Sequence, residues 1–542
     1  MSSWNFADLY EGIAARIPDH PCQIQGDRVI TWGHFDARTN ALTADLLKVG
    51  LSHSSKVAAY LYNCPEYLET YIAAFKGGFV PANTNYRYGP EEVSYLFDNS
   101  DAEAVVFHAA FTPIVDRIRS NLPKVKRWYC VADGTHSVPD WATDYEAVVG
   151  PGLTTSVSGP WGRSQDDLLF LYTGGTTGMP KGVMWRQYDI LHVLGLGGNA
   201  LLGVPPADSI EEIIDRMDPG VPATILLTAC PLMHGTGQFS SFLAMNMGGA
   251  VVTLKSRSFD VAELLSEIER NRVQTLIIVG QAFADPILDT LTENPDRYDL
   301  SSLVMISSSG VMWSQENKDG LLSFIPQVIL FDSFGSSEAI GMGGSVSTSG
   351  AISETAKFVL GPKCAVFTED GRRVQPGSGE RGLVAVGGNI PMGYYKDEVK
   401  SAQTFRIFDE QRWSVPGDWA EVQSDGTLVL LGRGSVCINT GGEKVFPEEV
   451  EEVLKRHVSV RDAVAVGIAD ARFGETICAV VEAAPGQVPT LLELSEHVKA
   501  ALSSFKAPRS LVVVASIGRA PNGKVDYKRL KALALKELGL EI

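Results

Sequence analysis

The residues best suited to chemistry form a short segment rich in glycine and threonine, YTGGTTGMPKG, at positions 172–182. It directly follows the apolar segment DLLFLY, so a strand would deliver it to the edge of a sheet. Glycines let backbone N–H groups wrap around an anion, threonine hydroxyls add donors, and the lysine adds a mobile positive charge. The segment therefore predicts a phosphate-binding loop formed by Thr173, Gly174, Gly175, Thr176, Thr177, Gly178 and Lys181.

This loop is not a Walker A motif, because Pro180 stands where that motif needs a glycine directly before the lysine. The alternative is an ordinary turn between two elements. The whole string is far more specific than a lone glycine-rich loop, so we favour the phosphate-binding interpretation.

Further short motifs follow in a fixed order along the chain. They are SSSGV (307–311), DSFGSSEAIG (332–341), WSVPGDWA (413–420), LGRGS (431–435), NTGGEKVFPEEVE (439–451) and PNGKVDY (521–527). Together with the loop, they resemble the signature of the adenylate-forming superfamily, which contains acyl-CoA synthetases, peptide-synthetase adenylation domains and luciferases. TGGTTGMPKGVMWR (173–186), GNIPMGYYKDE (388–398) and GRGSVCINTGGEKVFPEEVE (432–451) are most similar to actinobacterial acyl-CoA synthetases acting on fatty or sterol side-chain acids.

The resemblance implies an ATP-dependent acid–CoA ligase that uses Mg²⁺ and coenzyme A. The carboxylate would attack the α-phosphate and release pyrophosphate, and the CoA thiol would then attack the acyl-adenylate. A stand-alone enzyme that loads a carrier protein shares this chemistry and stays open, as does the identity of the acid: fatty, sterol side-chain or aryl. The intact motifs argue against a non-catalytic nucleotide-binding protein, and nothing specifically supports a luciferase-like oxygenase.

The resemblance also assigns the nucleotide site. Lys181 would neutralise the β- and γ-phosphates, Asp418 would accept the ribose hydroxyls, and Arg433 would donate to ribose or phosphate. Phe334 replaces the usual tyrosine, so it can stack on adenine but lacks the hydroxyl. The remaining nucleotide-binding residues implied are Ser309, Gly310, Val311, Asp332, Gly335, Ser336, Ser337 and Lys444.

The resemblance implies that Lys524 is the main catalytic residue and lies over the α-phosphate. Enzymes accelerate adenylyl and phosphoryl transfer mainly by stabilising charge and positioning the reactants. Glu338 with Thr176 would hold Mg²⁺, which proteins commonly bind through one carboxylate plus substrate phosphates. Each of three residues also has an interpretation without a functional role. Glu338 could lie at a helix N-terminus, Asp418 in a plain turn, and His234 could be a structural histidine. The acyl and CoA positions implied are His234, Gly335, Gly341, Gly441 and Gly442.

These residues are far apart in sequence, so the fold must bring them together. Apolar strand-like segments alternate with helical ones through the first hundred residues and again from 167 to 331, which predicts a doubly wound α/β body with mostly parallel sheets. Beyond about residue 350, short strands between Gly, Pro and Asp turns predict a small antiparallel unit. The segment 205–222 is acidic and bounded by prolines, which favours a surface insertion over the alternative of a lid.

The last part of the chain reads as a compact, mobile α+β domain large enough to fold alone. We predict an AMP-binding domain over residues 1–432, a hinge at 433–435 and a C-terminal domain over 436–542. Superfamily members often carry Asp or Lys where this chain has Ser435, but a hinge needs permissive backbone angles more than charge.

Charge, hydropathy and cysteine content exclude several other functional classes. The net charge is −18 over 542 residues with no basic block, which disfavours a nucleic-acid surface or a polybasic membrane patch. No apolar run is long enough to span a membrane, and the N-terminal residues do not read as a signal peptide. The seven cysteines are scattered, as in a reduced cytoplasmic protein. A homodimer stays open.

Overall fold

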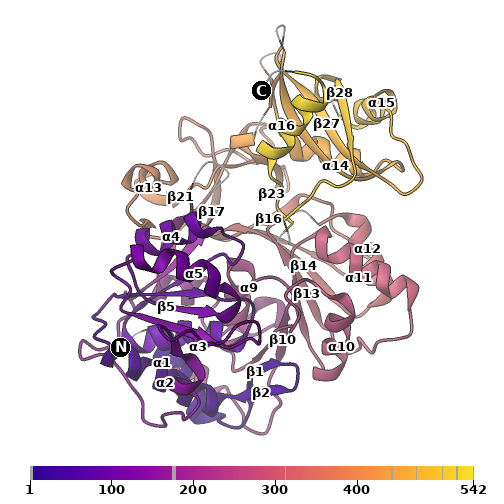
Figure 1. Cartoon of the computed structure of the whole chain (residues 1–542). Coiled ribbons are helices and arrows are strands. Elements are labelled where there is room, and N and C mark those ends of the chain that lie inside the picture. Colours follow the sequence, from indigo (N-terminus) through magenta and orange to yellow (C-terminus); the bar gives the residue numbers. More distant parts are fainter. Residues whose placement is uncertain are drawn as a thin grey trace.

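The computed structural model describes residues 4–173, 179–311, 313–436, 438–440, 443–470, 473–502, 504–520 and 523–540. Figure 1 shows a large body, coloured from indigo through pink to orange, beneath a smaller C-terminal unit, coloured orange to yellow. The predicted fold class is confirmed, because the body is built from α/β sheets and the last part of the chain is a separate α+β unit.

The first sheet of the body is parallel except at one edge, where β8, β9 and β19 pair antiparallel. Its strand order is β19-β9-β8-β4-β3-β5-β6-β7 among the described residues. The strands are β3 (Lys56–Tyr60), β4 (Val80–Asn83), β5 (Ala102–His108), β6 (Arg127–Val131), β7 (Thr143–Asp144), β8 (Leu168–Thr173), β9 (Lys181–Arg186) and β19 (Gly393–Tyr394). The helices around it are α2 (Trp32–Lys48), α3 (Pro65–Gly77), α4 (Pro90–Asn99), α5 (Thr112–Ile118) and α6 (Tyr145–Val149).

Successive residues of β3 belong to different cores, which explains its unbroken apolar run. Val57 and Ala59 pack into the main core between the sheets, whereas Ala58 and Tyr60 pack under α4 and α5. Both faces of the sheet are covered in this way, which favours apolar residues at successive positions from Val57 to Tyr60.

The second sheet is larger and joins the parallel strands to the antiparallel unit. Its described order is β2-β1-β11-β10-β12-β13-β14-β15-β16-β23-β22-β18-β21-β20, with β17 beside β18. The parallel part comprises β1 (Pro21–Gln25), β10 (Ile225–Thr228), β11 (Ala250–Val252), β12 (Thr275–Ile278), β13 (Met305–Ser309) and β14 (Ile329–Ser336), with β2 (Arg28–Thr31) antiparallel at the edge. The small β unit is therefore continuous with this sheet through the antiparallel pair β14–β15.

The antiparallel strands of this sheet are β15 (Ala339–Ser347), β16 (Lys357–Leu360), β17 (Cys364–Phe367), β18 (Arg381–Gly387), β20 (Phe405–Phe408), β21 (Gln411–Ser414), β22 (Asp418–Val422) and β23 (Thr427–Arg433). The other helices of the body are α1 (Phe6–Arg16), α7 (Gln187–Val193), α8 (Ile210–Asp215), α9 (Gly235–Met245), α10 (Val261–Asn271), α11 (Gln281–Glu293), α12 (Gln315–Phe324) and α13 (Glu398–Thr404). Helix α8 lies in the predicted insertion, and its Ile214 side chain packs closely against Gly12 of α1.

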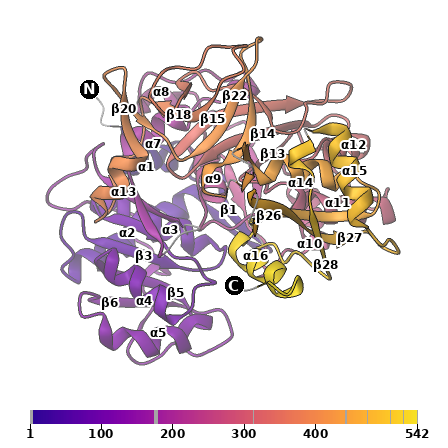
Figure 2. The ribbon, with the colours of Figure 1, turned by 90° about the horizontal axis from the view of Figure 1, so that it is seen from above.

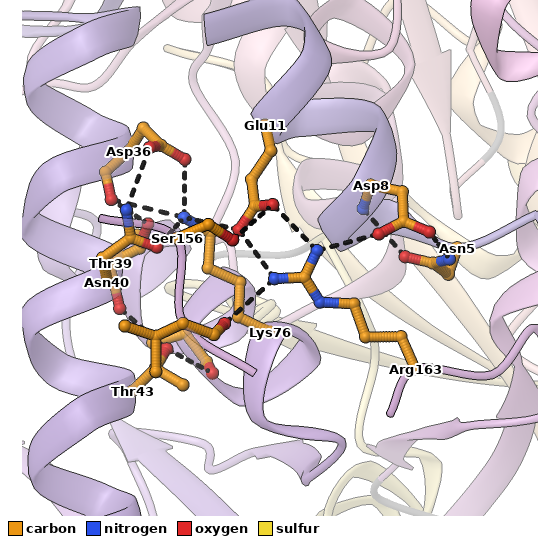
Figure 3. A network of polar contacts seen from close by, with 12 residues as sticks. Asn5, Asp8, Glu11, Asp36, Thr39, Asn40, Thr43, Lys76, Ser156 and Arg163 are labelled. Carbon is orange, nitrogen blue, oxygen red and sulfur yellow. Dashed lines mark hydrogen bonds and ion pairs between the residues drawn. The ribbon is translucent and has the colours of Figure 1, made fainter. Parts of the chain in front are cut away.

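A buried polar network ties α1 to α2 and α3 (Figure 3). The fully buried Lys76 places its Nζ 2.6 Å from Oδ1 of Asp36 and 3.5 Å from Oε1 of Glu11. Arg163 then bonds Glu11 at 2.6 Å and Asp8 at 2.8 Å. Burial lowers the pKa of Lys76, although Asp36 opposes that shift. Removing one partner would leave an uncompensated buried charge, so this network fixes the N-terminal helix to the body.

The C-terminal unit folds around its own sheet, of described order β25-β24-β27-β26 with β28 beside β27. Its elements are β24 (Ile438–Thr440), β25 (Glu443–Val445), α14 (Pro447–Lys455), β26 (Val460–Asp470), β27 (Gly474–Ala483), α15 (Leu491–Ala501), β28 (Ser510–Val514) and α16 (Tyr527–Glu537). Separate apolar clusters lie on its two faces. Seen from above, the unit covers the side of the body that carries β13 and β14 (Figure 2).

Candidate active site

A cavity of about 1440 Å³ lies where the C-terminal unit meets the body. Its walls come from the carboxyl-terminal ends of β13 and β14, from one face of α9 and from the segment around Lys524. Ligands of open α/β sheets bind outside the carboxyl ends of the strands, so this is the expected place for a nucleotide. The predicted site residues that line the cavity are Thr173, His234, Ser309, Gly310, Gly335, Ser336, Ser337, Gly341 and Lys524.

The strand ends at this cavity present small residues side by side. Ser309 of β13 pairs in register with Ser333 of β14, so Gly310 and Gly335 follow at neighbouring strand ends. Gly310 has a φ of +92°, which favours glycine. Small side chains here leave room for a flat ring close to the backbone.

The predicted phosphate lysine begins β9, opposite Thr173 of β8. Its Nζ lies 2.6 Å from Oδ2 of Asp397, and both side chains are about one-third exposed. Gly174, Gly175, Thr176, Thr177 and Gly178 lie outside the described residues, as do Gly441 and Gly442.

Glu338 lies at the turn between β14 and β15, and not at a helix N-terminus. The Tyr394 hydroxyl donates a 2.8 Å hydrogen bond to Oε1 of Glu338, while Ser414 Oγ donates to the Glu338 carbonyl at 2.6 Å. In the described part of the chain, no three His, Cys, Asp or Glu side chains gather as a metal cage. A single fixed carboxylate fits Mg²⁺ that takes its other ligands from nucleotide phosphates and water.

Lys524 is carried by a tight turn before α16. The Ala520 N–H donates to the Lys524 carbonyl at 2.9 Å, and the Gly523 N–H donates to the Ala520 carbonyl at 2.7 Å. Arg519 Nη1 donates to the Gly523 carbonyl at 3.3 Å, and two nitrogens of the same guanidinium bond Asp462 at 2.6 and 2.8 Å. The Asp462–Arg519 pair therefore braces the turn that presents Lys524.

His234 faces the same cavity from the residue that precedes α9. Burial, together with the positive charges of Lys524 and Arg87, lowers the pKa of His234 to about 3. The imidazole is therefore neutral near pH 7 and a weak base, which suits a wall of the carboxylate site. A carboxylate nucleophile needs no proton removed, so no base is required.

Other predicted residues lie outside the described lining of the cavity. Asp332 is buried on β14 with Lys318 at 3.3 Å, and burial raises its pKa to about 6. The Phe334 ring stacks on Phe358, with centroids 5.4 Å apart. Val311 contacts the turn at Gly523 instead. The nucleotide roles of these three residues stay predictions.

The predicted ribose-binding pair lies on adjacent strands. Asp418 of β22 is buried and stands in register with Arg433 of β23. Lys444 belongs to β25 of the C-terminal unit. The ribose-binding roles of Asp418 and Arg433, which the resemblance implies, stay predictions.

The sequence motifs assign no role to several residues that contact predicted site residues or line the cavity. Tyr394 contacts Glu338 and Asp397 contacts Lys181, yet the GYYKDE string serves only as part of the resemblance. Residues of α9 line the cavity, but the sequence of this helix carries no motif. Arg519 lies two residues before the PNGK string, and its spacing to Asp462 gave no signal.

Comparison with known proteins places the chain in a family. The model of the AMP-binding enzyme family matches residues 10–395, and that of the AMP-binding enzyme C-terminal domain matches residues 449–524. A medium/long-chain-fatty-acid–CoA/3-oxocholest-4-en-26-oate–CoA ligase of Mycolicibacterium smegmatis is 38% identical over 97% of this chain and 96% of its own length. A 3-oxocholest-4-en-26-oate–CoA ligase of Rhodococcus rhodochrous is 39% identical over 97% of this chain and 95% of its own length.

Solved structures support the same fold. The anthranilate CoA ligase AuaEII in complex with anthranoyl-AMP superimposes with a TM-score of 0.83 over 99% of this chain and 98% of its own, at 20% identity. The fold of the whole chain is therefore that of these ligases. The chain belongs to the AMP-binding, adenylate-forming enzyme family. Within it, the chain is an acid–thiol ligase of the acyl-CoA synthetase class, as the motifs predicted.

Proposed function

We propose that this enzyme converts a long apolar carboxylic acid, of the fatty or sterol side-chain class, into its CoA thioester at the expense of ATP. The observation that carries the proposal is the shape and lining of the cavity. Beyond His234 the cavity is bounded by α9 on one side and by a sheet face on the other. Apolar side chains dominate the walls of this part of the cavity.

The helix wall of this apolar part follows helical spacing. Gly235, Phe239, Leu243 and Ala244 line it, so the lined stretch extends about 14 Å along the axis at 1.5 Å per residue. An extended chain advances roughly 1.2 Å per bond, so about a dozen bonds of an acyl chain would fit beside α9.

The opposite wall follows strand spacing. Alternate residues of three neighbouring strands face the cavity, which places one side of the sheet along the acyl chain. The residues are Thr275 and Ile277 of β12, Met305, Ser307 and Ser309 of β13, and Phe331, Ser333 and Gly335 of β14. A flat steroid ring system or an extended alkyl chain both match a slot between a helix and a flat sheet face.

The chemistry proceeds in two steps with distinct needs. In the first, the substrate carboxylate attacks the α-phosphate of ATP and pyrophosphate leaves; Lys524 stabilises the added negative charge and Lys181 holds the β- and γ-phosphates. Glu338, with Thr176 by resemblance, would hold Mg²⁺, which supplies further charge neutralisation on the phosphates. In the second, the CoA thiol attacks the acyl carbon and AMP leaves.

Coenzyme A as the acceptor is supported by the relatives, whose names make them CoA ligases. A carrier-protein thiol is the second candidate for the acceptor.

No helix in the described ranges is long and apolar enough to cross a membrane. A cytoplasmic location is supported by the free cysteines of the described residues, nearly all buried. A homodimer stays a prediction.

The test is CoA-dependent AMP formation with straight-chain acids of increasing length, a sterol side-chain acid and a benzoic-type acid. We expect the wild type to favour medium and long apolar acids. Ala244→Phe should fill the slot partway along α9, so long acids lose at least about tenfold in kcat/KM while short acids retain activity. Ala262→Phe on exposed α10 is the matched control. Equal turnover of long acids by Ala244→Phe, or a preference for the benzoic-type acid, would contradict the proposal.

A further inference from the structure

One turn of the chain contacts both the predicted metal carboxylate, Glu338, and the predicted phosphate lysine, Lys181. Tyr394 bonds Glu338, and Asp397, three residues further on, bonds Lys181. The Lys181 Nζ also lies 5.8 Å from the centroid of the Tyr394 ring. The turn 394–397 therefore connects the predicted metal carboxylate with the phosphate lysine.

This turn is anchored to the strand that carries Lys181. Strand β19 pairs antiparallel with β9, matching Tyr394 with Val183, and the Tyr395 N–H donates to the Gly182 carbonyl at 2.8 Å. Ser401 Oγ closes the turn from the far side: it accepts from the Tyr394 N–H at 2.8 Å and donates to the Asp397 carbonyl at 2.6 Å.

The middle of the turn is held independently by Asp101. The Tyr395 hydroxyl donates to Asp101 at 2.7 Å, and Lys396 Nζ lies 2.7 Å from the same carboxylate. Lys124 also bonds Asp101, and these donors hold the pKa of that carboxyl well below its usual range. Asp397 is thus fixed by backbone and side-chain contacts that do not involve Lys181.

The Asp397 carboxylate uses its two oxygens for different tasks. Oδ1 accepts from the Lys400 N–H at 2.9 Å and caps α13, while Oδ2 faces Lys181. Hydrogen bonds from the Lys181 ammonium and from the Lys400 N–H lower the pKa of Asp397, so the carboxyl is ionised at neutral pH. A negative charge therefore stands beside the lysine that the proposed function gives to phosphates.

We infer that Asp397 is a counter-ion that competes with phosphate for Lys181. The Asp397 carboxylate accepts a hydrogen bond from the Lys181 ammonium and fixes its position. When the β- and γ-phosphates arrive, they must displace or share that contact and overcome the carboxylate charge. Asp397 thereby weakens the binding of pyrophosphate and favours its departure after adenylation. This inference rests on the proposed phosphate role of Lys181.

The experiment measures binding of magnesium pyrophosphate to the full-length enzyme by calorimetry, without acid or CoA. Asp397→Asn should tighten pyrophosphate binding on the order of tenfold, since hydrogen bonds to charged groups contribute more than neutral ones. Asparagine caps helices as well as aspartate, so α13 should keep its cap and the melting temperature should stay close to wild type. Inhibition of turnover by pyrophosphate should strengthen by the same factor.

Glu398→Gln is the matched control, because it removes the same charge from the next residue, which is exposed, whereas the ion pair with Lys181 is made by Asp397. It should change pyrophosphate binding by less than about twofold. In Lys181→Ala, binding should weaken, and adding Asp397→Asn to that variant should bring no gain, because the competition acts through the lysine.

Three other outcomes of the binding measurements would each contradict one part of the inference. If Asp397→Asn leaves binding unchanged or weakens it while Lys181→Ala weakens it, Asp397 only positions the lysine and the inference is wrong. If Asp397→Asn tightens pyrophosphate binding even in Lys181→Ala, the carboxylate repels pyrophosphate directly, and competition for Lys181 is wrong. If Lys181→Ala binds pyrophosphate like wild type, the proposed role of Lys181 itself is wrong.

Discussion

Gly523 of the C-terminal unit lies directly against Val311 at the end of β13, so that a Cβ at position 523 would come within 2.7 Å of Val311 Cγ2. The φ of Gly523 is +70°, which also disfavours any larger residue. This contact seats the turn that carries Lys524 on the strand ends of the body. Lys524 thus lies at the cavity, as its proposed role in the first half-reaction requires.

The first prediction concerns Lys524. Lys524→Ala should lower adenylation on the order of 10²–10³-fold, because a positive charge at the α-phosphate stabilises the transition state of that step. Thioester formation from supplied acyl-adenylate should stay largely intact, since the thiol attacks carbon. Pyrophosphate release and acyl-CoA formation are measured separately, with Lys528→Ala, another exposed lysine at the cavity, as control. Equal loss in both half-reactions would refute the assignment.

The second prediction concerns Glu338. Glu338→Gln should weaken the use of Mg²⁺–ATP more than the fold, because an amide is a poorer ligand than a carboxylate for a hard cation. The melting temperature without ligand should stay near wild type, since glutamine can still accept from the Tyr394 hydroxyl. The rise caused by Mg²⁺–ATP should shrink, because ligand binding to the native state raises apparent stability. A full ligand-induced rise in the variant would count against a metal role.

The regular elements were predictable because hydrophobic periodicity is local. The alternation predicted for the first hundred residues appears as β3, α3, β4, α4 and β5 in succession. Local patterns cannot report which distant strands share a sheet. The antiparallel strands beyond residue 350 therefore looked like a unit of their own, whereas β14 and β15 join them to the parallel strands.

The site was predictable only as far as its motifs reach. Lys181, Glu338 and Lys524 were chosen by string resemblance, and their contacts depend on residues hundreds of positions or several elements away. Lys181 and Asp397, for example, are 216 positions apart. Long-range pairing is therefore the physical limit on predicting the site from sequence.

The third prediction concerns pH and His234. The pKa of His234 is lowered to about 3 in the folded protein, against about 6.5 in an unfolded chain. Between these values the unfolded state binds a proton that the folded state refuses, so stability falls as pH falls from about 6.5 toward 3. One such group changes the free energy of unfolding by at most about 1.4 kcal/mol per pH unit.

His234→Gln should therefore flatten the fall of unfolding free energy between about pH 6.5 and 5, measured with denaturant. It should not flatten it fully, because burial also lowers the pKa of His108, to about 4. The exposed His136→Gln is the control and should follow the wild-type profile. An unchanged slope in His234→Gln would show that the imidazole is not held neutral by the cavity.

The last prediction concerns the predicted hinge between residues 1–432 and 436–542. Strand β23 ends at Arg433, residues Gly434–Val436 form a 3₁₀ turn, and the sheet of the C-terminal unit begins at Ile438. The Gly434 N–H still bonds the Gly417 carbonyl of the body at 3.1 Å. The change of sheet thus falls where the LGRGS motif predicted a pivot.

Two half-reactions need two arrangements around one acyl carbon. By resemblance, Lys524 would occupy the approach in the first, and the Gly441–Gly442 segment would replace it in the second so that the thiol can enter. Ser435→Pro should restrict φ at 435 and push Gly434 away from helical ψ, so the rotation is hindered. Pyrophosphate should still appear in a burst of adenylate formation, while CoA-dependent turnover falls. Ser435→Ala leaves the backbone free and should turn over like wild type. If Ser435→Pro forms acyl-CoA at the wild-type rate, the rotation does not pivot at this turn and the domain boundary lies elsewhere.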